Sequence, residues 1–448
     1  MPSERLYWTQ AQRLYRLDAM RHSIIRRSLV LTTFYISGHG FYYLLLLIAN
    51  AMLDPTGFGR LYTGWAVLNV LVAPISIIAL LLSSYFAQAN SDNGPAFVSR
   101  MLARIAAIAL PWTAGTVLLL EVLFYVGGRL IGADSLALIL VLPLTAVSFL
   151  GVEIVRASLQ GTLRFVAFGA SWFLWCVAQC AVGAIGLLLT RSPWGCFAGM
   201  LVANLLTLAG LCWAVAGEGP AAPAATQDSP KLASYSLQRA LAFCSAFVGF
   251  VLFNNADIFL AYLILSPADL GIYTASSVLP KAIVTATQPV VQIILPVVIS
   301  IQGEGEDTSQ AVMKAIFAAF ALGAAAFMVL WAGSDLACAP HGIRFCTTPL
   351  MLLLAAAAVP LSVIRTLVTA DVAHGRYWLP HLPFLALAVF AAAMTLTKMS
   401  GPAENLHLAT TYLYSCWGLL AVWAIAGILR GRLFARGEIT PVTLRGRQ

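Results

Sequence analysis

The sequence has 448 residues, of which 60% are hydrophobic and 10% are charged, with a mean hydropathy of +0.86 and a formal net charge of +8. An ordinary soluble domain is about 25% charged, so this chain has too little polar surface to enclose a soluble core of its size. The composition therefore excludes a soluble protein and indicates an integral membrane protein with many spans and short loops. The positive charge does not indicate nucleic-acid binding, because the basic residues are scattered among loop ends and tails.

The N-terminal segment, residues 1–27, is rich in arginine, with aromatic residues and leucines interspersed. It fits either an interfacial helix on an anionic membrane surface or a disordered basic tail. No cleavable signal peptide is evident, because the first apolar run is long enough to span a membrane.

Twelve transmembrane helices are predicted after this segment, since a hydrocarbon core near 30 Å requires roughly 20 apolar residues per helix. Residues 217–235, between the sixth and seventh runs, are rich in alanine, proline and polar residues and are predicted to form a cytoplasmic linker between six-helix lobes at 1–216 and 236–448. The predicted spans lie at about 28–52, 60–85, 103–128, 134–158, 163–189, 193–216, 238–264, 268–299, 311–333, 348–370, 378–398 and 407–429.

Lysine and arginine are distributed unevenly between the two sides of the predicted membrane. Nineteen of the 26 basic residues fall on the side of the N-terminus, five fall on the other side, and Lys281 and Arg365 lie within spans. Because cytoplasmic loops carry the excess of basic residues, both termini are predicted to be cytoplasmic.

A turn motif occurs once in each half of the chain. Leu53–Gly59 (LDPTGFG) and Leu265–Gly271 (LSPADLG) share the pattern Leu-x-Pro-x-x-(Phe/Leu)-Gly and lie 212 residues apart, and a tyrosine follows each copy. Each copy falls between the first and second apolar runs of its half, which is typical of the internal repeats of transporters.

The second copy of the turn lies in the stretch from Phe253 to Lys281. Ser266 is a favourable N-cap, Pro267 suits the first helical position, and Asp269 can reach back as in a capping box. The stretch is therefore predicted to form two antiparallel helices joined by a tight turn.

Polar groups that hydrocarbon should reject lie on the flanks of this turn, at Asn254, Asn255, Asp257 and Lys281. An ionisable side chain inside a membrane helix is a functional-site hypothesis by default. Counted from the turn, Asp257 lies roughly 13 Å along its helix and Lys281 roughly 22 Å along the next, so an ion pair depends on the reach of the lysine. The alternative is a structural polar contact that stabilises the hairpin.

The run NNADI, the short turn and SPADLGIYTASSVLPK together resemble the seventh and eighth helices of bacterial polysaccharide exporters. These are the lipid-linked oligosaccharide flippases, resembling the O-antigen flippases, of the MOP (MATE-like) superfamily, and LDPTGFGRLYTG is similar to their first hairpin. The resemblance implies a MATE-like fold, with two six-helix bundles related by a pseudo-two-fold axis around a cleft.

The same resemblance implies a transporter that is not an enzyme. Its substrate would be a polyprenyl-diphosphate-linked oligosaccharide, moved from the cytoplasmic to the periplasmic leaflet of the bacterial inner membrane by alternating access, for O-antigen, capsule or exopolysaccharide synthesis. Its partners would be this lipid-linked substrate and the bilayer. A polysaccharide polymerase and other assembly proteins are further candidate partners.

A diphosphate head group requires cations inside an otherwise apolar protein, and Lys281 and Arg365 are the deepest ones available. Asp257 and Glu153 are the candidates to balance these cations or to bind a coupling ion. Asn254 and Asn255 would line the same cavity.

The fourth predicted span carries Glu153, Arg156 and Gln160 at i, i+3 and i+7. For Arg156 and Gln160 the favoured interpretation is a face that snorkels to the membrane interface, whereas Glu153 lies deeper. Arg365 lies 212 residues beyond Glu153, the same offset as the turn repeat.

Prolines interrupt the eighth predicted span, and Pro280 and Pro289 are candidate gating positions. A proline removes a backbone hydrogen bond and kinks a helix, so the span could bend near Lys281. Simple kinked packing is the alternative.

The sequence has no Walker loop, catalytic triad or DxD-like motif, and its eight cysteines follow no zinc or redox pattern. No metal or cofactor is therefore expected, and energy would come from an ion gradient, the membrane potential or the downstream use of product. Cys338 and Cys346 share one predicted external loop and are either disulfide-bonded or free thiols.

Two other functions stay open. A MATE-type multidrug antiporter would prefer an acidic cavity, and the deep basic residues weigh against it. A membrane polymerase or ligase would usually need a larger external loop than the one between Gly333 and Thr348.

Overall fold

A computed structural model describes residues 30–93 (except 32), 136–216 (except 163), 237–291 (except 289), 308–374 (except 340 and 341), 379–400 and 405–435, together with a few isolated positions. Within these ranges nearly every residue is helical and no strand is present. The chain divides into two compact units, Met1–Cys244 and Ser245–Gln448. The predicted linker at 217–235 lies outside the described residues, so the predicted lobe boundaries stay a prediction.

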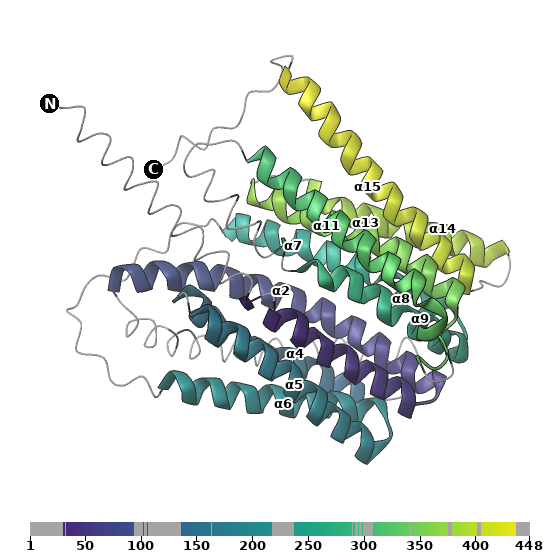
Figure 1. The fold of residues 1–448 in the computed structure, drawn as a ribbon, viewed down its shortest axis with the longest axis horizontal. Helices are drawn as coiled ribbons and strands as arrows, with labels where there is room; N and C mark the ends of the chain where they lie inside the picture. Colours follow the sequence, from purple (N-terminus) through teal and green to yellow (C-terminus); the bar gives the residue numbers. More distant parts are fainter. Residues whose placement is uncertain are drawn as a thin grey trace. The chain divides into compact units, whose positions relative to one another are not determined.

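The first unit contains a helix over residues 33–52, then α2 (Pro55–Asn93), α4 (Leu136–Gly161), α5 (Phe165–Thr190) and α6 (Pro193–Ala216). Within it, α4 packs against α2 and α6, and α5 packs along α6, as Figure 1 shows.

The α5–α6 pair is held close by glycines. A Cβ atom at Gly186 would stand 2.1 Å from the Gly195 carbonyl oxygen, and one at Gly199 would stand 2.3 Å from the Val182 carbonyl oxygen. Small residues allow helix backbones to approach in a membrane, where lipid supplies no hydrophobic force between helices. The two helices are therefore fixed by backbone contact.

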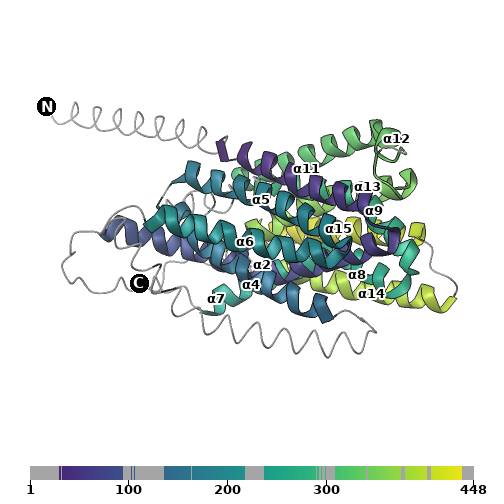
Figure 2. The ribbon, with the colours of Figure 1, turned by 90° about the horizontal axis from the view of Figure 1, so that it is seen from below.

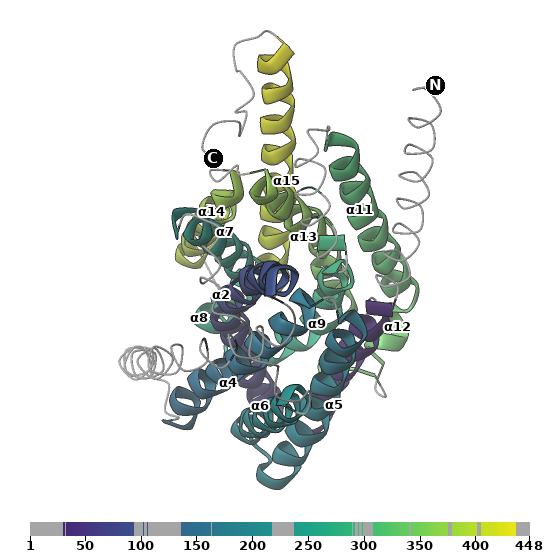
Figure 3. The same ribbon diagram turned by 90° about the vertical axis from the view of Figure 1, so that its left-hand side faces the viewer.

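The second unit begins within α7 (Leu237–Asn254) and is built around α13 (Thr348–Ala373). In this unit α13 packs against α9 (Pro267–Ala286), α11 (Ser309–Ala332) and α15 (Asn405–Ala435), an arrangement visible in Figure 3. The remaining elements are α8 (Ala256–Ile264), α12 (Ser334–Ala337), the 3₁₀ turn η1 (Leu379–His381) and α14 (Leu382–Ser400).

The described helices include eight that are long and apolar enough to cross a membrane, or nine if the bent pair Cys244–Asn254 and Ala256–Ile264 is one span. These correspond to nine of the twelve predicted spans. Of the other three, the first is helical over 33–52, the eighth is helical as α9, and the third, at 103–128, lies outside the described residues except for position 105. The predicted class, an all-α polytopic membrane protein, is confirmed.

Both copies of the turn motif start a helix in the same way. In the second copy, the Asp269 backbone N–H donates to Ser266 Oγ over 3.2 Å, and α9 begins at Pro267. In the first copy, the Gly57 backbone N–H donates to Asp54 Oδ1 over 3.0 Å, and α2 begins at Pro55. An N-cap oxygen and a proline without an N–H together satisfy the open end of each helix.

The loop between α12 and α13 contains a disulfide between Cys338 and Cys346. The short helix α12 follows directly on α11, as Figure 2 shows. Of the two alternatives for these cysteines, the structure therefore has the disulfide-bonded one.

Candidate functional site

The seventh predicted span is broken. The sequence predicts one span over about 238–264, but α7 ends at Asn254, α8 begins at Ala256, and the two pieces meet at an angle of 49°. At the break, Asn255 Nδ2 donates to the Val251 carbonyl oxygen over 2.8 Å. Asparagine side chains compete with the helical ladder in this way, which is why the break falls at this residue.

Asp257 and Lys281 form an ion pair across the hairpin. Lys281 Nζ lies 2.9 Å from Asp257 Oδ1, and the Asp257 side chain is fully buried. The lysine side chain thus covers the difference in depth between the two helices.

The Lys281 ammonium group has two further neighbours beside the break. It donates a hydrogen bond to the Asn254 carbonyl oxygen, and it lies 5.3 Å from the centre of the Tyr412 ring. The Tyr412 hydroxyl donates to the carbonyl oxygens of Phe253, over 3.2 Å, and Asn254, over 3.1 Å. Residues of α7, α8, α9 and α15 are therefore in contact at the break.

Helix electrostatics favours each charge in its place. The Asn254 carbonyl belongs to the last turn of α7, where backbone oxygens carry partial negative charge and attract a cation such as Lys281. Asp257 lies in the first turn of α8, where the exposed N–H groups favour an anion. A continuous helix would offer neither end at this depth.

A small cavity of about 10 Å³ adjoins the ion pair, which is room for roughly one water molecule. Near it, the buried atoms Asp257 Oδ2, Asn254 Oδ1 and the Tyr273 hydroxyl have no hydrogen-bond partner among the described residues. Its lining comprises Asp257, Ser277, Pro280, Lys281, Leu354, Ala358, Leu361 and Tyr412.

The structure thus brings together four of the predicted site residues, Asn254, Asn255, Asp257 and Lys281, and the cavity wall includes a fifth, Pro280. Helix α9 continues through Pro280 as far as Ala286, and the bend lies at Asn255 on the neighbouring span. Pro289 lies outside the described residues.

Arg365 is placed apart from this group. It lies on α13, and its guanidinium carbon is 5.8 Å from the Phe247 ring and 5.9 Å from the Phe250 ring, both on α7. It does not belong to the cavity lining around Asp257. The two predicted cavity cations therefore occupy different surroundings within the second unit.

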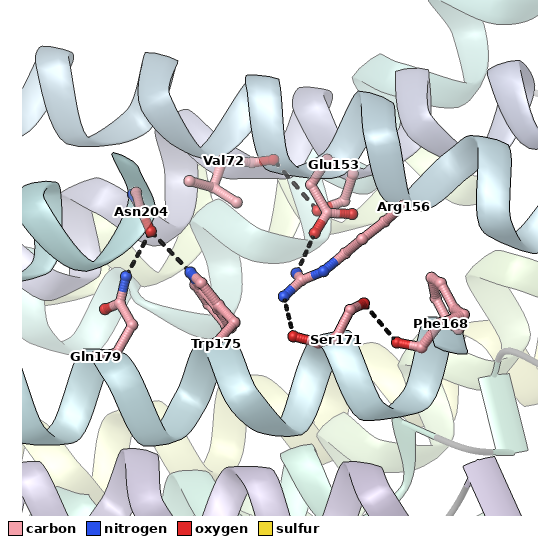
Figure 4. A network of polar contacts seen from close by, with 9 residues as sticks. Val72, Glu153, Arg156, Phe168, Ser171, Trp175, Gln179 and Asn204 are labelled. Carbon is pink, nitrogen blue, oxygen red and sulfur yellow. Dashed lines mark hydrogen bonds and ion pairs between the residues drawn. The ribbon is translucent and has the colours of Figure 1, made fainter. Parts of the chain in front are cut away.

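Glu153 belongs to a buried ion pair in the first unit. Arg156 Nη1 lies 2.7 Å from Glu153 Oε1, and Arg156 Nη2 donates to the Ser171 carbonyl oxygen over 3.0 Å. The guanidinium carbon lies 4.8 Å from the centre of the Trp172 ring and 5.0 Å from that of Trp175. Figure 4 shows Arg156 reaching from α4 to the backbone of α5.

The snorkelling interpretation of Arg156 is wrong, because its side chain is completely buried. The i, i+3 spacing places Glu153 and Arg156 together, but the tryptophans and the Ser171 carbonyl that complete the arginine's surroundings come from another helix. The sequence alone carries no signal for that partner.

Asn204 is the centre of a polar network beside this ion pair that sequence reasoning missed. Its Oδ1 accepts hydrogen bonds from Trp175 Nε1, over 2.7 Å, and from Gln179 Nε2, over 2.6 Å, as drawn in Figure 4. Its Nδ2 donates to the Thr145 carbonyl, over 3.0 Å, and to Ser148 Oγ, over 2.9 Å. The amide therefore ties α4, α5 and α6 together.

No group of three or more histidine, cysteine, aspartate or glutamate side chains that could hold a metal ion occurs in the part of the chain that the structure describes. The polar side chains of both sites form ion pairs, hydrogen bonds and cation–π contacts. These contacts hold the charged side chains in place, and an ionic ligand could replace one partner of an ion pair.

Comparison with known protein families gives a match over the central part of the chain. Residues 131–336, which include both ion pairs, match a family model described as polysaccharide biosynthesis protein. No curated protein matches the sequence.

Several solved structures have the same fold. A MATE transporter in the straight conformation aligns with a TM-score of 0.66 at 13% identity, covering 93% of this chain and 96% of that chain. An outward-facing multidrug resistance MATE family transporter of the MOP superfamily aligns with a TM-score of 0.65 at 12% identity, covering 92% and 97%.

A MOP superfamily transporter from Pyrococcus furiosus, described as having a binding pocket of reverse polarity that suggests a different function, aligns with a TM-score of 0.63 at 14% identity, covering 92% and 96%. At these identities the likeness concerns the fold. The resemblance found in the sequence is thereby confirmed: the chain is a multi-pass membrane protein with the fold of the MATE/MOP transporters, and its central residues match a polysaccharide biosynthesis family.

Proposed function

We propose that this protein is a flippase that moves a polyprenyl-diphosphate-linked oligosaccharide from the cytoplasmic to the periplasmic leaflet of the bacterial inner membrane. The product would serve surface polysaccharide synthesis, as O-antigen, capsule or exopolysaccharide. The observation that carries the proposal is the polysaccharide biosynthesis match over residues 131–336, set within a transporter fold.

The charges of the second unit fit an anionic head group. Arg365 and Lys281 are cations within the span region, and both lie against aromatic rings, at Phe247, Phe250 and Tyr412. In this structure Lys281 is held by Asp257, so a diphosphate would have to compete with that carboxylate for the ammonium group. Arg365, which lies against Phe247 and Phe250 on α7, is the proposed first contact of the diphosphate.

The carboxylates weigh against the alternative, a multidrug antiporter that carries cationic drugs. Asp257 and Glu153 are each already within 3 Å of a lysine or arginine nitrogen, at 2.9 Å and 2.7 Å. A paired carboxylate attracts an organic cation far less than a free one does, because the partner's positive charge cancels much of its field.

Removal of the two cations tests the proposal. Arg365→Ala should abolish surface glycan in the producing bacterium while protein abundance in the membrane stays largely intact. Lys281→Ala should abolish surface glycan too, but with a loss of abundance, because it leaves Asp257 buried without its partner; glycan is therefore scored relative to the amount of protein. Lys281→Arg should retain part of the export, because it keeps the charge. Normal export by both alanine variants would show that the diphosphate is held elsewhere, and Lys314→Ala, at an exposed position of α11, is the matched control.

Reporter fusions test the proposed orientation. Fusions at Ala224 and in the C-terminal tail should report cytoplasm, and a fusion at Gly342, in the disulfide-bonded loop, should report periplasm. An external signal at Ala224 would overturn the division into two six-helix halves.

A further inference from the structure

The contacts of Lys281 Nζ are those of a bound cation. They are a carboxylate oxygen of Asp257 at 2.9 Å, the backbone carbonyl oxygen of Asn254, and the face of the Tyr412 ring at 5.3 Å. Carboxylates and the carbonyl oxygens of broken helix ends hold sodium ions in proteins, and the faces of aromatic rings attract ammonium groups.

The arrangement is more than a chance ion pair, because the backbone is shaped for it. The span stops at Asn254 and resumes at Ala256 with a bend of 49°, and this break turns the Asn254 carbonyl toward the lysine. The hydroxyl of Tyr412, bonded to the same carbonyl over 3.1 Å, holds the ring beside the ammonium group. Three helices, α7, α8 and α15, thus supply or position ligands for the positive charge that α9 carries.

We infer that the break between α7 and α8 is a monovalent-cation site whose resident cation is the ammonium group of Lys281. The lysine occupies, on a covalent tether, the position that a sodium ion would otherwise take. While Lys281 is paired with Asp257, as in this structure, the native protein binds no sodium ion at this site, and removal of the ammonium group opens the site to one.

The site has the ligands that a free ion would need once the ammonium group is gone. Asp257 Oδ1 and the Asn254 carbonyl oxygen lose their partner, and two buried oxygens, Asp257 Oδ2 and Asn254 Oδ1, already have none within the described residues. The adjoining cavity of about 10 Å³ holds roughly one water, which could complete the shell of the ion. The space vacated by the lysine side chain adds to this volume.

Each helix packed against the site contributes side chains that could interact with a bound ion. Asp257 is on α8, Ser277 and Lys281 are on α9, and Tyr412 is on α15, while the α13 wall is formed by apolar side chains at Leu354, Ala358 and Leu361. Asp257 is thus the carboxylate among these lining groups, and the charge of a bound ion would be balanced by it alone.

Thermal unfolding of the purified full-length protein in detergent tests the inference without any transport assay. Wild type, Lys281→Ala and Lys281→Ala/Asp257→Asn are compared in sodium chloride and in choline chloride at equal ionic strength. Lys281→Ala should show a saturable rise in unfolding midpoint with sodium of at least about 2 °C, because a ligand that binds only the folded state stabilises it. Wild type and the double variant should show no such rise.

Binding of radioactive sodium gives a second readout on the same samples. We expect saturable binding to Lys281→Ala, and background binding to wild type, to the double variant and to the control Lys314→Ala. If Lys281→Ala does not survive extraction, Lys281→Ser replaces it, because its small side chain also leaves Asp257 and the Asn254 carbonyl without the ammonium group.

Two results would overturn the inference. One is a folded Lys281 variant that neither binds sodium nor gains stability from it. The other is wild-type protein that binds sodium in a manner abolished by Asp257→Asn. Neither result depends on the glycan, so failure here and failure of the proposed flippase function are distinguishable.

Discussion

The ion pairs Glu153–Arg156 and Asp257–Lys281 are both buried and short, at 2.7 and 2.9 Å between charged atoms, yet they are built into their units in different ways. The first joins two residues one turn apart on α4, and its arginine is completely enclosed by α5. The second joins two helices at a break in a span, beside a cavity, and 13% of its lysine side chain is exposed.

Their surroundings also differ in how much they can rearrange. Around Arg156, two tryptophans and the Asn204 network fill the space between three continuous helices. Around Lys281, a helix end, a cavity and unpartnered buried oxygens leave room for a partner to be exchanged. The comparison indicates that the first pair holds helices together, whereas the second pair has space for Lys281 to change partners.

The largest effect is expected for Arg156→Ala. Removing the arginine leaves Glu153 buried and uncompensated, which typically costs about 3–5 kcal/mol. Abundance in the membrane, measured by blotting and by size-exclusion chromatography after extraction, should fall severely. Gln160→Ala, one turn further along α4, is the control and should be well tolerated; normal abundance of Arg156→Ala would break the proposed contrast between the pairs.

The second pair should respond differently. Asp257→Asn leaves Lys281 without its carboxylate and should reduce both abundance and surface glycan. In Asp257→Asn/Lys281→Gln, abundance should recover, because a buried pair replaced by neutral groups is often tolerated. Export should not recover if Asp257 takes part in each cycle.

A comparison of the two single variants and the double variant decides this point, with abundance and export scored separately. Restored export in the double variant would contradict a role for Asp257 in ion coupling. The Asp257–Lys281 pair would then be structural, like the Glu153–Arg156 pair.

The smallest effect is expected for Tyr412→Phe. The variant keeps the aromatic face near Lys281 but loses the hydroxyl bonds to the carbonyls of Phe253 and Asn254. A net loss of about 1 kcal/mol is typical for such a bond, so the unfolding midpoint should fall slightly and export should fall in part. Tyr414→Phe, at an exposed position two residues away, is the matched control and should change neither.

Much of the second site could be predicted from its sequence because the signals there are local. The cap at Ser266 and the proline at Pro267 act within one turn of the helix they begin, and the structure has both. The polar residues Asn254, Asp257 and Lys281 stand out against apolar neighbours, so their importance is visible without a fold. Whether the lysine would meet the aspartate depended on the side chain's path, which only coordinates give.

The composition and periodicity of the chain determined its class, an all-α membrane protein, because the demand for about 20 apolar residues per span is set by the bilayer and not by the partners of each helix. Only the tertiary structure decided three features: the burial of Arg156, the helix break at Asn255 and the contacts of Tyr412 with Lys281 and the Asn254 carbonyl. Arg156 can be buried because its guanidinium group donates to the carbonyl oxygen of Ser171, 15 residues away, and lies over the rings of two tryptophans of α5. The Asn254 carbonyl is held by a tyrosine 158 residues along the chain. A hydropathy pattern records how apolar a helix is, but which polar groups find partners depends on contacts between helices that are distant in sequence.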